Sequence, residues 1–169
     1  MNWTKLLESE IESTYKATDG LMKLVGKSPL DWKPATGSNW MTTGQLLQHC
    51  TNACGMCCKA FVTGEWPAPA DAAPGDMAPC ADKMPSAKSV AAARKALAAD
   101  KAIALEVVRS SGEKNLGYKI LVAPWNPEPK SLGKHCMEMV GHLRSHKSQL
   151  YYYLKLQGKP VNTGHLWGM

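Results

Sequence analysis

Residues 139–154 have the sequence MVGHLRSHKSQLYYYL. We predict that they belong to a long helix that Ser131 caps, that reaches Gln157 and that Gly158 and Pro160 stop. A helix of this kind needs a partner for its apolar face, and the rest of the chain contains suitable partners.

Three further segments carry helical patterns, mostly with apolar side chains three and four residues apart. Thr42 and Gln45 fit a capping box at the start of the second segment, which we expect to be one unbroken helix. The predicted helices span residues 3–25, 44–61 and 86–108, with Gly26 ending the first and Gly112 closing the third.

The segments between these helices predict long, irregular loops. Five of the eleven prolines lie between Gly64 and Pro85, where we expect a mobile loop. Residues 113–130 allow a short extended piece but offer it no partner strand, so no sheet is expected. The sequence therefore predicts an all-α fold, a four-helix bundle in a single domain over residues 1–169.

Composition excludes several classes of protein. Hydrophobic residues make up 44% of the 169 and charged residues 20%, which is typical of a folded chain. No apolar run approaches the roughly 20 residues of a membrane span, and the first residues do not resemble a signal peptide. Six cysteines without an export signal favour free thiols in a reducing compartment, so we expect a cytoplasmic protein.

The net charge of +6 does not indicate a nucleic-acid-binding protein. Only Arg94, Arg109 and Arg144 supply guanidinium groups, and the lysines are scattered rather than clustered with aromatic residues. We expect no specific binding of nucleic acid and no membrane partner.

His142 and His146 are four residues apart in the last predicted helix. At about 100° per residue they share a helical face and lie about 6 Å apart along the axis, so both imidazoles can reach one metal ion. The spacing equals that of zincin proteases, but Leu143 stands where those enzymes need a glutamate base. A metalloprotease is therefore disfavoured. The alternative is that two histidines share a face by chance.

His49 lies in the middle of the second predicted helix. It should face the core, where an unpaired imidazole is costly and coordination would satisfy it. Together with His142 and His146 it would form a site with open coordination positions, which is typical of catalytic zinc. A hydrogen-bonded core histidine without a metal is the alternative.

Several stretches resemble the DinB/YfiT-like superfamily, namely residues 30–34, 40–49, 139–154 and 157–161. The resemblance implies a four-helix bundle with up-down-down-up connections and a homodimer. It also implies hydrolysis or thiol transfer, with a low-molecular-weight thiol as the nucleophile in several branches. Finally, it implies one divalent ion, held by His49, His142 and His146.

The other histidines fit this site less well. His135 is about 10 Å along the helix axis from His142, too far to join the same ion, and is expected in the core or at the end of a pocket. Glu138 lies one turn before His142, so it either orients that imidazole or is an exposed carboxylate. His165 is expected at the surface or docked on a neighbouring element.

The cysteines are expected to pack in the core rather than to bind metal. Four of them share a helical face turned away from His49, and no second C-x-x-C completes a zinc ribbon. A di-iron site is rejected because no pair of Glu-x-x-His motifs is present. The clustered cysteines are Cys50, Cys54, Cys57 and Cys58, while Cys80 and Cys136 are isolated.

The three histidines indicate a metal-dependent enzyme, and the family resemblance implies a hydrolase or thiol S-transferase that acts on a small-molecule substrate. One divalent ion, zinc or nickel, would activate a water or a thiol, and no catalytic residue beyond the ligands is identified. The alternative is a non-catalytic metal-binding stress protein or dimerisation scaffold. An apolar pocket with converging polar groups above the histidines would favour the enzyme.

Overall fold

The computed structural model describes residues 2–66 and 80–169, and these are mostly helical. The long helices are α1 (Trp3–Val25), α4 (Val90–Tyr118) and α5 (Leu132–Leu156). The shorter helices are α2 (Thr43–Cys50), α3 (Gly55–Thr63) and α6 (Thr163–Trp167), with a 3-10 turn η1 (Ala81–Lys83). Two strands are also present, β1 (Ile120–Ala123) and β2 (Asn126–Ser131).

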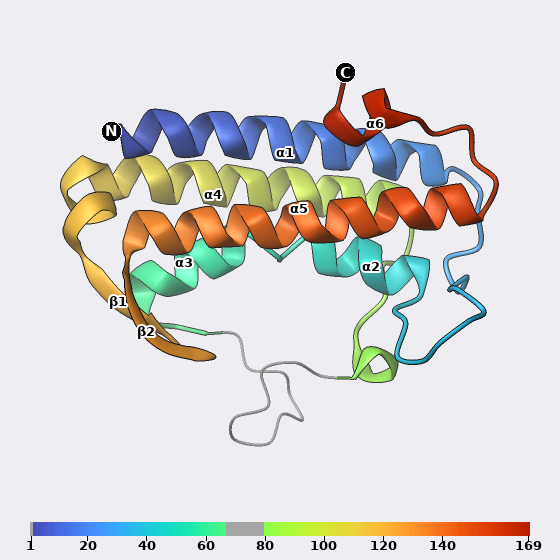
Figure 1. Cartoon of the computed structure of the whole chain (residues 1–169), viewed down its shortest axis with the longest axis horizontal. Coiled ribbons are helices and arrows are strands. Elements are labelled where there is room, and N and C mark those ends of the chain that lie inside the picture. Colours follow the sequence, from blue (N-terminus) through green and yellow to red (C-terminus); the bar gives the residue numbers. More distant parts are fainter. Residues whose placement is uncertain (1, 67–79) are drawn as a thin grey trace.

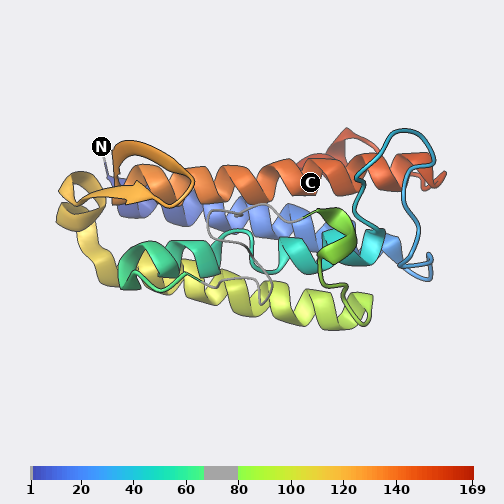
Figure 2. The same ribbon diagram turned by 90° about the horizontal axis from the view of Figure 1, so that it is seen from below.

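The three long helices lie side by side, and α2 and α3 follow each other along them (Figure 1, Figure 2). α1 and α5 run in one direction, and α2, α3 and α4 run in the other (Figure 1). α1 packs on α4 and α5, while α2 and α3 each contact both α4 and α5. The core between them is apolar, and burial of each large side chain contributes about 1.5–3 kcal/mol. Its fully buried members include Leu7, Ile11, Leu21, Leu97, Leu143 and Leu150.

Several predicted helix ends are confirmed. α1 ends at Val25, and Gly26 follows it with a positive φ of 58°. The side chain of Ser131 accepts a hydrogen bond from the first turn of α5. Thr42 and Gln45 form both hydrogen bonds of the predicted capping box at the start of α2. Local sequence signals are sufficient at these ends because the capping groups are neighbours in the chain.

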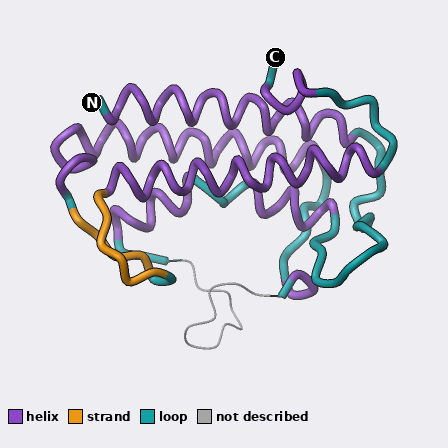
Figure 3. Tube along the Cα trace, viewed as in Figure 1, coloured by secondary structure: helices purple, strands orange, loops and turns teal. Residues whose placement is uncertain are grey.

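The prediction of one unbroken helix over residues 44–61 is wrong. α2 ends at Cys50, α3 begins at Gly55, and an irregular turn separates them (Figure 3). Because α3 starts anew after the break, its first N–H groups have no hydrogen-bond acceptor within their own helix.

Asp100 of α4 satisfies these groups. Its side chain is only 2% exposed, and its carboxylate accepts hydrogen bonds from the N–H groups of Gly55 at 2.9 Å and Met56 at 2.8 Å. The hydroxyl of Tyr15 in α1 donates a third, at 2.6 Å. Burial raises the pKa of Asp100, and the hydrogen bonds from Tyr15, Gly55 and Met56 oppose that rise. A carboxylate from another helix thus caps α3.

Gly55 has no room for a side chain, because a Cβ there would lie 2.0 Å from the backbone oxygen of Asp100. We expect Gly55→Ala to lower the free energy of unfolding by about 1–3 kcal/mol, since α3 and α4 must move apart. Gly20→Ala in α1 is the matched control, because its Cβ would meet nothing within 4 Å, and it should stabilise by up to about 1 kcal/mol. Urea unfolding measures both. Equal effects of the two substitutions would contradict the close approach.

The expectation that the chain forms no sheet is also wrong. β1 and β2 pair as an antiparallel hairpin, with Ile120 opposite Ser131 and Leu121 opposite Lys130. Each strand is the partner of the other, and the prolines of β2 are tolerated because a two-stranded sheet consists only of edges.

The third predicted helix is displaced at both ends. α4 begins at Val90 rather than at residue 86, and it extends past the predicted end at residue 108 to Tyr118. Gly112 was expected to close it but only interrupts its geometry, with φ 70° and ψ 162°. Helical residues resume beyond the glycine and carry the chain to the hairpin.

The loop predicted over residues 64–85 is described only at its ends, because residues 67–79 lie outside the described part of the chain. At its far end, the amide of Gln45 donates hydrogen bonds to the carbonyls of Ala81 and Met84, which attaches η1 to α2. Across residues 2–66 and 80–169, no helix has the length and apolar character needed to cross a bilayer.

Candidate metal centre

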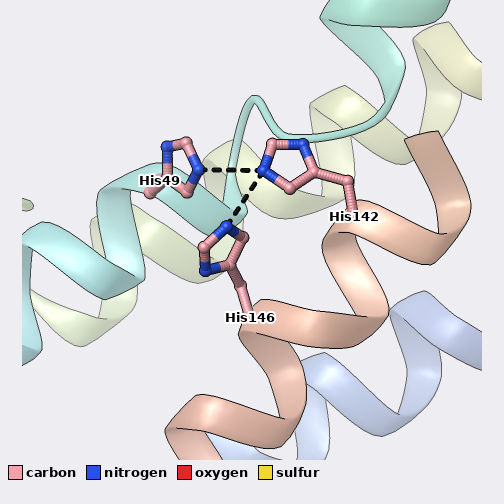
Figure 4. A group of neighbouring side chains, drawn as sticks. All are labelled: His49, His142 and His146. Atoms are coloured by element: carbon pink, nitrogen blue, oxygen red, sulfur yellow. Dashed lines mark hydrogen bonds between the residues drawn. The ribbon is translucent and has the colours of Figure 1, made fainter. Parts of the chain in front are cut away.

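The three predicted ligands come together where α2 lies along α5. His49 projects from α2, and His142 and His146 project from successive turns of α5 (Figure 4). The Nε2 atoms of His49 and His142 are 3.2 Å apart, and those of His142 and His146 are 2.9 Å apart. One ligand atom from each ring lies within 4.8 Å of the other two. The structure thus brings together side chains that are 93 and 4 residues apart in the sequence.

All three imidazoles are half-buried, and this burial favours their neutral form. Burial, followed by the nearby His146 and His142, lowers the pKa of His49 to about 4. Burial is also the main cause that lowers the pKa of His142 and of His146. At neutral pH the rings are therefore uncharged, which is the form that coordinates a metal.

The orientation of His142 is set by the break in the second helix. Its Nδ1 atom lies 3.1 Å from the carbonyl oxygen of Ala53, between α2 and α3. In a continuous helix that carbonyl would accept from the N–H of Cys57, but the break leaves it available. Because a carbonyl only accepts, Nδ1 of His142 carries the proton and Nε2 presents a lone pair to the cluster.

This donor set fits a divalent ion. Three imidazole nitrogens bound to one ion at about 2.0–2.1 Å lie about 3.3 Å from one another in a tetrahedral site. The separations of 2.9 and 3.2 Å are close to that value. Within the described ranges, this is the one group of three or more His, Cys, Asp or Glu side chains with geometry suited to a metal. Neutral imidazole suits zinc, nickel, copper and iron.

The remaining candidates lie away from the cluster. His135 is a core residue, 1% exposed, with Nε2 3.0 Å from the carbonyl of Leu121. The hypothesis that Glu138 orients His142 is wrong, because the outer nitrogen of His142 contacts the carbonyl of Ala53 instead. Glu138 accepts a hydrogen bond from Lys130 at 2.8 Å. His165 is half-exposed on α6.

All six cysteines are free thiols. Burial raises the pKa of Cys50 and of Cys57 to about 12, so these thiols are protonated at neutral pH. The predicted core packing is confirmed for the buried cysteines, whereas Cys57 is half-buried and Cys80 is exposed. The buried ones are Cys50, Cys54, Cys58 and Cys136.

Two groups that contact the site were missed by the sequence analysis. Gln149 is 3.1 Å from Nδ1 of His146, through its Oε1 atom, and its position three residues after that histidine was a usable signal. The carbonyl of Ala53 could not be found in this way, because it reaches His142 only through the break between α2 and α3.

A family model described as the DinB superfamily matches residues 10–150. That range includes all three clustered histidines and every element from α2 to β2. No curated protein and no solved structure matches the chain significantly.

Proposed function

We propose that this chain, which belongs to the DinB superfamily, binds one divalent ion through His49, His142 and His146 and uses it in hydrolysis or thiol transfer. The superfamily is a metal-binding one. The observation that carries the proposal is the convergence of three Nε2 atoms from two helices, two of them only 2.9 Å apart.

The directions of the helices support a four-helix bundle with up-down-down-up connections, in which α2 and α3 together form the second helix (Figure 1). The packing of α6 on α1 supports a single domain over residues 1–169. The homodimer and the cytoplasmic location stay predictions from the sequence.

Zinc or nickel suits these ligands, and such an ion supplies Lewis acidity that lowers the pKa of a bound water or thiol towards about 7. The chain contributes three neutral imidazoles, which add no negative charge of their own. The site should therefore favour anionic small molecules, including the thiolate of a low-molecular-weight thiol.

One observation favours the alternative, a non-catalytic metal-binding stress protein or dimerisation scaffold. The outer partners of the cluster among the described residues are the carbonyl of Ala53 and the amide of Gln149. Neither group can donate or accept a catalytic proton in the physiological pH range. An enzyme would then depend on the ion itself for its chemistry.

The test begins with protein purified without an affinity tag and without added metal. Elemental analysis should find about one zinc or nickel ion per chain. Turnover of thiol substrates, small esters and small amides should disappear when the ion is removed by a chelator and return when it is restored. Protein without any ion would favour the scaffold, and activity that survives removal of the ion would contradict the metal-dependent mechanism.

Metal retention should persist to a lower pH than at an ordinary histidine site. The ligands bind only when neutral, and the pKa of His49 is lowered to about 4, with those of His142 and His146 also below the usual 6.5. Protons therefore compete with the ion only under acidic conditions. Equilibrium dialysis between about pH 8 and 4 measures retention. Release of the ion above neutral pH would contradict the prediction.

The same pKa shifts determine how the free energy of unfolding of the metal-free protein changes with pH. Below the unfolded pKa of 6.5 the unfolded chain takes up protons that the folded imidazoles do not, because the folded pKa values are lower. The free energy of unfolding should therefore decrease as the pH falls from about 6.5 towards 4. Urea unfolding at each pH measures it, with a His49→Ala variant showing a weaker dependence.

A further inference from the structure

A chain of hydrogen bonds extends from His146 to the start of α2. Nδ1 of His146 lies 3.1 Å from Oε1 of Gln149, and the amide nitrogen of Gln149 lies 3.4 Å from the hydroxyl of Tyr153. That hydroxyl lies 2.8 Å from the carbonyl oxygen of Met41. Met41 comes immediately before Thr42, which caps α2.

The direction of every bond follows from its far end. The carbonyl of Met41 can only accept, so the hydroxyl of Tyr153 donates to it. The phenol oxygen then accepts from the NH₂ group of Gln149, which turns Oε1 of that amide towards His146. Because Oε1 only accepts, a neutral His146 that makes this bond carries its proton on Nδ1. The Nε2 lone pairs of His142 and His146 then face each other at 2.9 Å, an arrangement that a shared cation would stabilise.

Tyr153 is held firmly in place. Its side chain is 1% exposed, and the rings of Trp32 and Trp40 contact it edge to face at centroid distances of 5.3 and 6.2 Å. A fixed phenol keeps the amide of Gln149 from rotating, because only one of its two orientations pairs with both neighbours.

We propose that Gln149 and Tyr153 are positioning residues of the metal centre, which hold His146 in the tautomer whose Nε2 lone pair faces His49 and His142. The inference rests on the proposed function, because it assigns these residues to the same site. The chain of hydrogen bonds also connects α5 to Met41, which precedes the cap of α2. It therefore links the two helices that carry the three histidines.

The first experiment compares metal affinity at pH 7.5, measured for zinc by competition with a chromophoric chelator. Gln149→Leu should weaken binding by about 10–100-fold, the usual effect of losing an outer partner of a histidine ligand. Gln149→Glu keeps an acceptor opposite Nδ1, so it should bind at least as tightly as the wild type. The affinity of Tyr153→Phe for zinc should lie between those of the wild type and Gln149→Leu.

Gln48→Leu is the matched control. Gln48 is a half-buried glutamine beside a ligand, but its amide donates to the hydroxyl of Thr51 rather than contacting an imidazole. The affinity of this variant for zinc should stay within about twofold of the wild type, below the loss of about 10–100-fold expected for an outer partner. Circular dichroism verifies that each variant is folded, and Gln149→Met replaces Gln149→Leu if the latter is not.

The second experiment reads the tautomer without any metal. Long-range ¹H–¹⁵N correlation spectra of the metal-free protein at pH 8 should show His146 with its proton on Nδ1 in the wild type and in Gln149→Glu. In Gln149→Leu the same ring should become a mixture of tautomers. A wild-type ring with its proton on Nε2, or an unchanged spectrum in Gln149→Leu, would overturn the inference.

The two experiments separate the possible failures. If wild-type protein binds neither zinc nor nickel, the proposed function is wrong, while the spectra still decide whether Gln149 sets the tautomer. If wild-type protein binds zinc and Gln149→Leu binds it equally well, the positioning role is wrong and the proposed function stands.

Discussion

Replacement of His142 by alanine should weaken the affinity for zinc or nickel by more than about 100-fold, beyond the range for the loss of an outer partner. Its Nε2 atom is 3.2 Å from that of His49 and 2.9 Å from that of His146, so it is common to both close contacts in the cluster. Without it, two imidazoles on different helices remain to hold the ion. Titration calorimetry measures the affinity and the stoichiometry of each variant.

His165→Ala is the control, because His165 is a half-exposed histidine on α6 that does not belong to the cluster. It should leave both the affinity and the stoichiometry unchanged. His49→Ala and His146→Ala should resemble His142→Ala. If any of these three single variants binds the ion with full affinity and stoichiometry, the ion lies elsewhere.

Asp100→Ala should lower the free energy of unfolding by about 3–5 kcal/mol. The substitution removes the acceptor of three hydrogen bonds, from Tyr15, Gly55 and Met56, in a site that water does not reach. Each buried donor left without a partner costs about 1–3 kcal/mol. For a chain of this size the loss corresponds to a decrease of about 10 °C in the melting temperature, which scanning calorimetry measures.

Asp19→Ala provides the comparison for this loss. Asp19 forms an ion pair with Arg94 at 2.6 Å, but both side chains are about one third exposed, so its loss should cost at most about 1 kcal/mol. If the two substitutions have similar effects, the carboxylate of Asp100 does not support the start of α3. A second consequence concerns His142, because the turn that Asp100 stabilises also presents the carbonyl of Ala53. We expect Asp100→Ala to weaken metal binding as well.

The parts of the protein that could be predicted depend on residues close together in the chain. Gly26 marks the end of α1, and Ser131 marks the start of α5. The shared face of His142 and His146 follows from the helical repeat. His49 was predicted to join them from its place in the second predicted helix and from the family resemblance. It was expected in the middle of that helix, but it lies in the last turn of α2, because the helix ends at Cys50. These are short-range rules, and they identified both helices that carry the cluster.

The hairpin shows where such rules were applied too strictly. A short extended piece was expected within residues 113–130, but no partner strand was expected for it. Residues 126–131 supply that partner although Pro127 and Pro129 are unfavourable within a sheet. In a hairpin of two strands those prolines lie on an edge, where no ladder hydrogen bond is required of them.

The break between α2 and α3 depends on contacts between distant parts of the chain. Residues 44–61 contain no proline, so local propensity favours a continuous helix, but Asp100, 45 residues beyond Gly55, supplies a buried acceptor at the new helix start. The same break releases the carbonyl of Ala53 to hold His142. The amino-acid order was enough to place the three clustered histidines on their helices. The orientation of His142 and the approach of the three rings were decided by groups that only packing brings together, because a hydrogen bond depends on distance in space and not on separation along the chain.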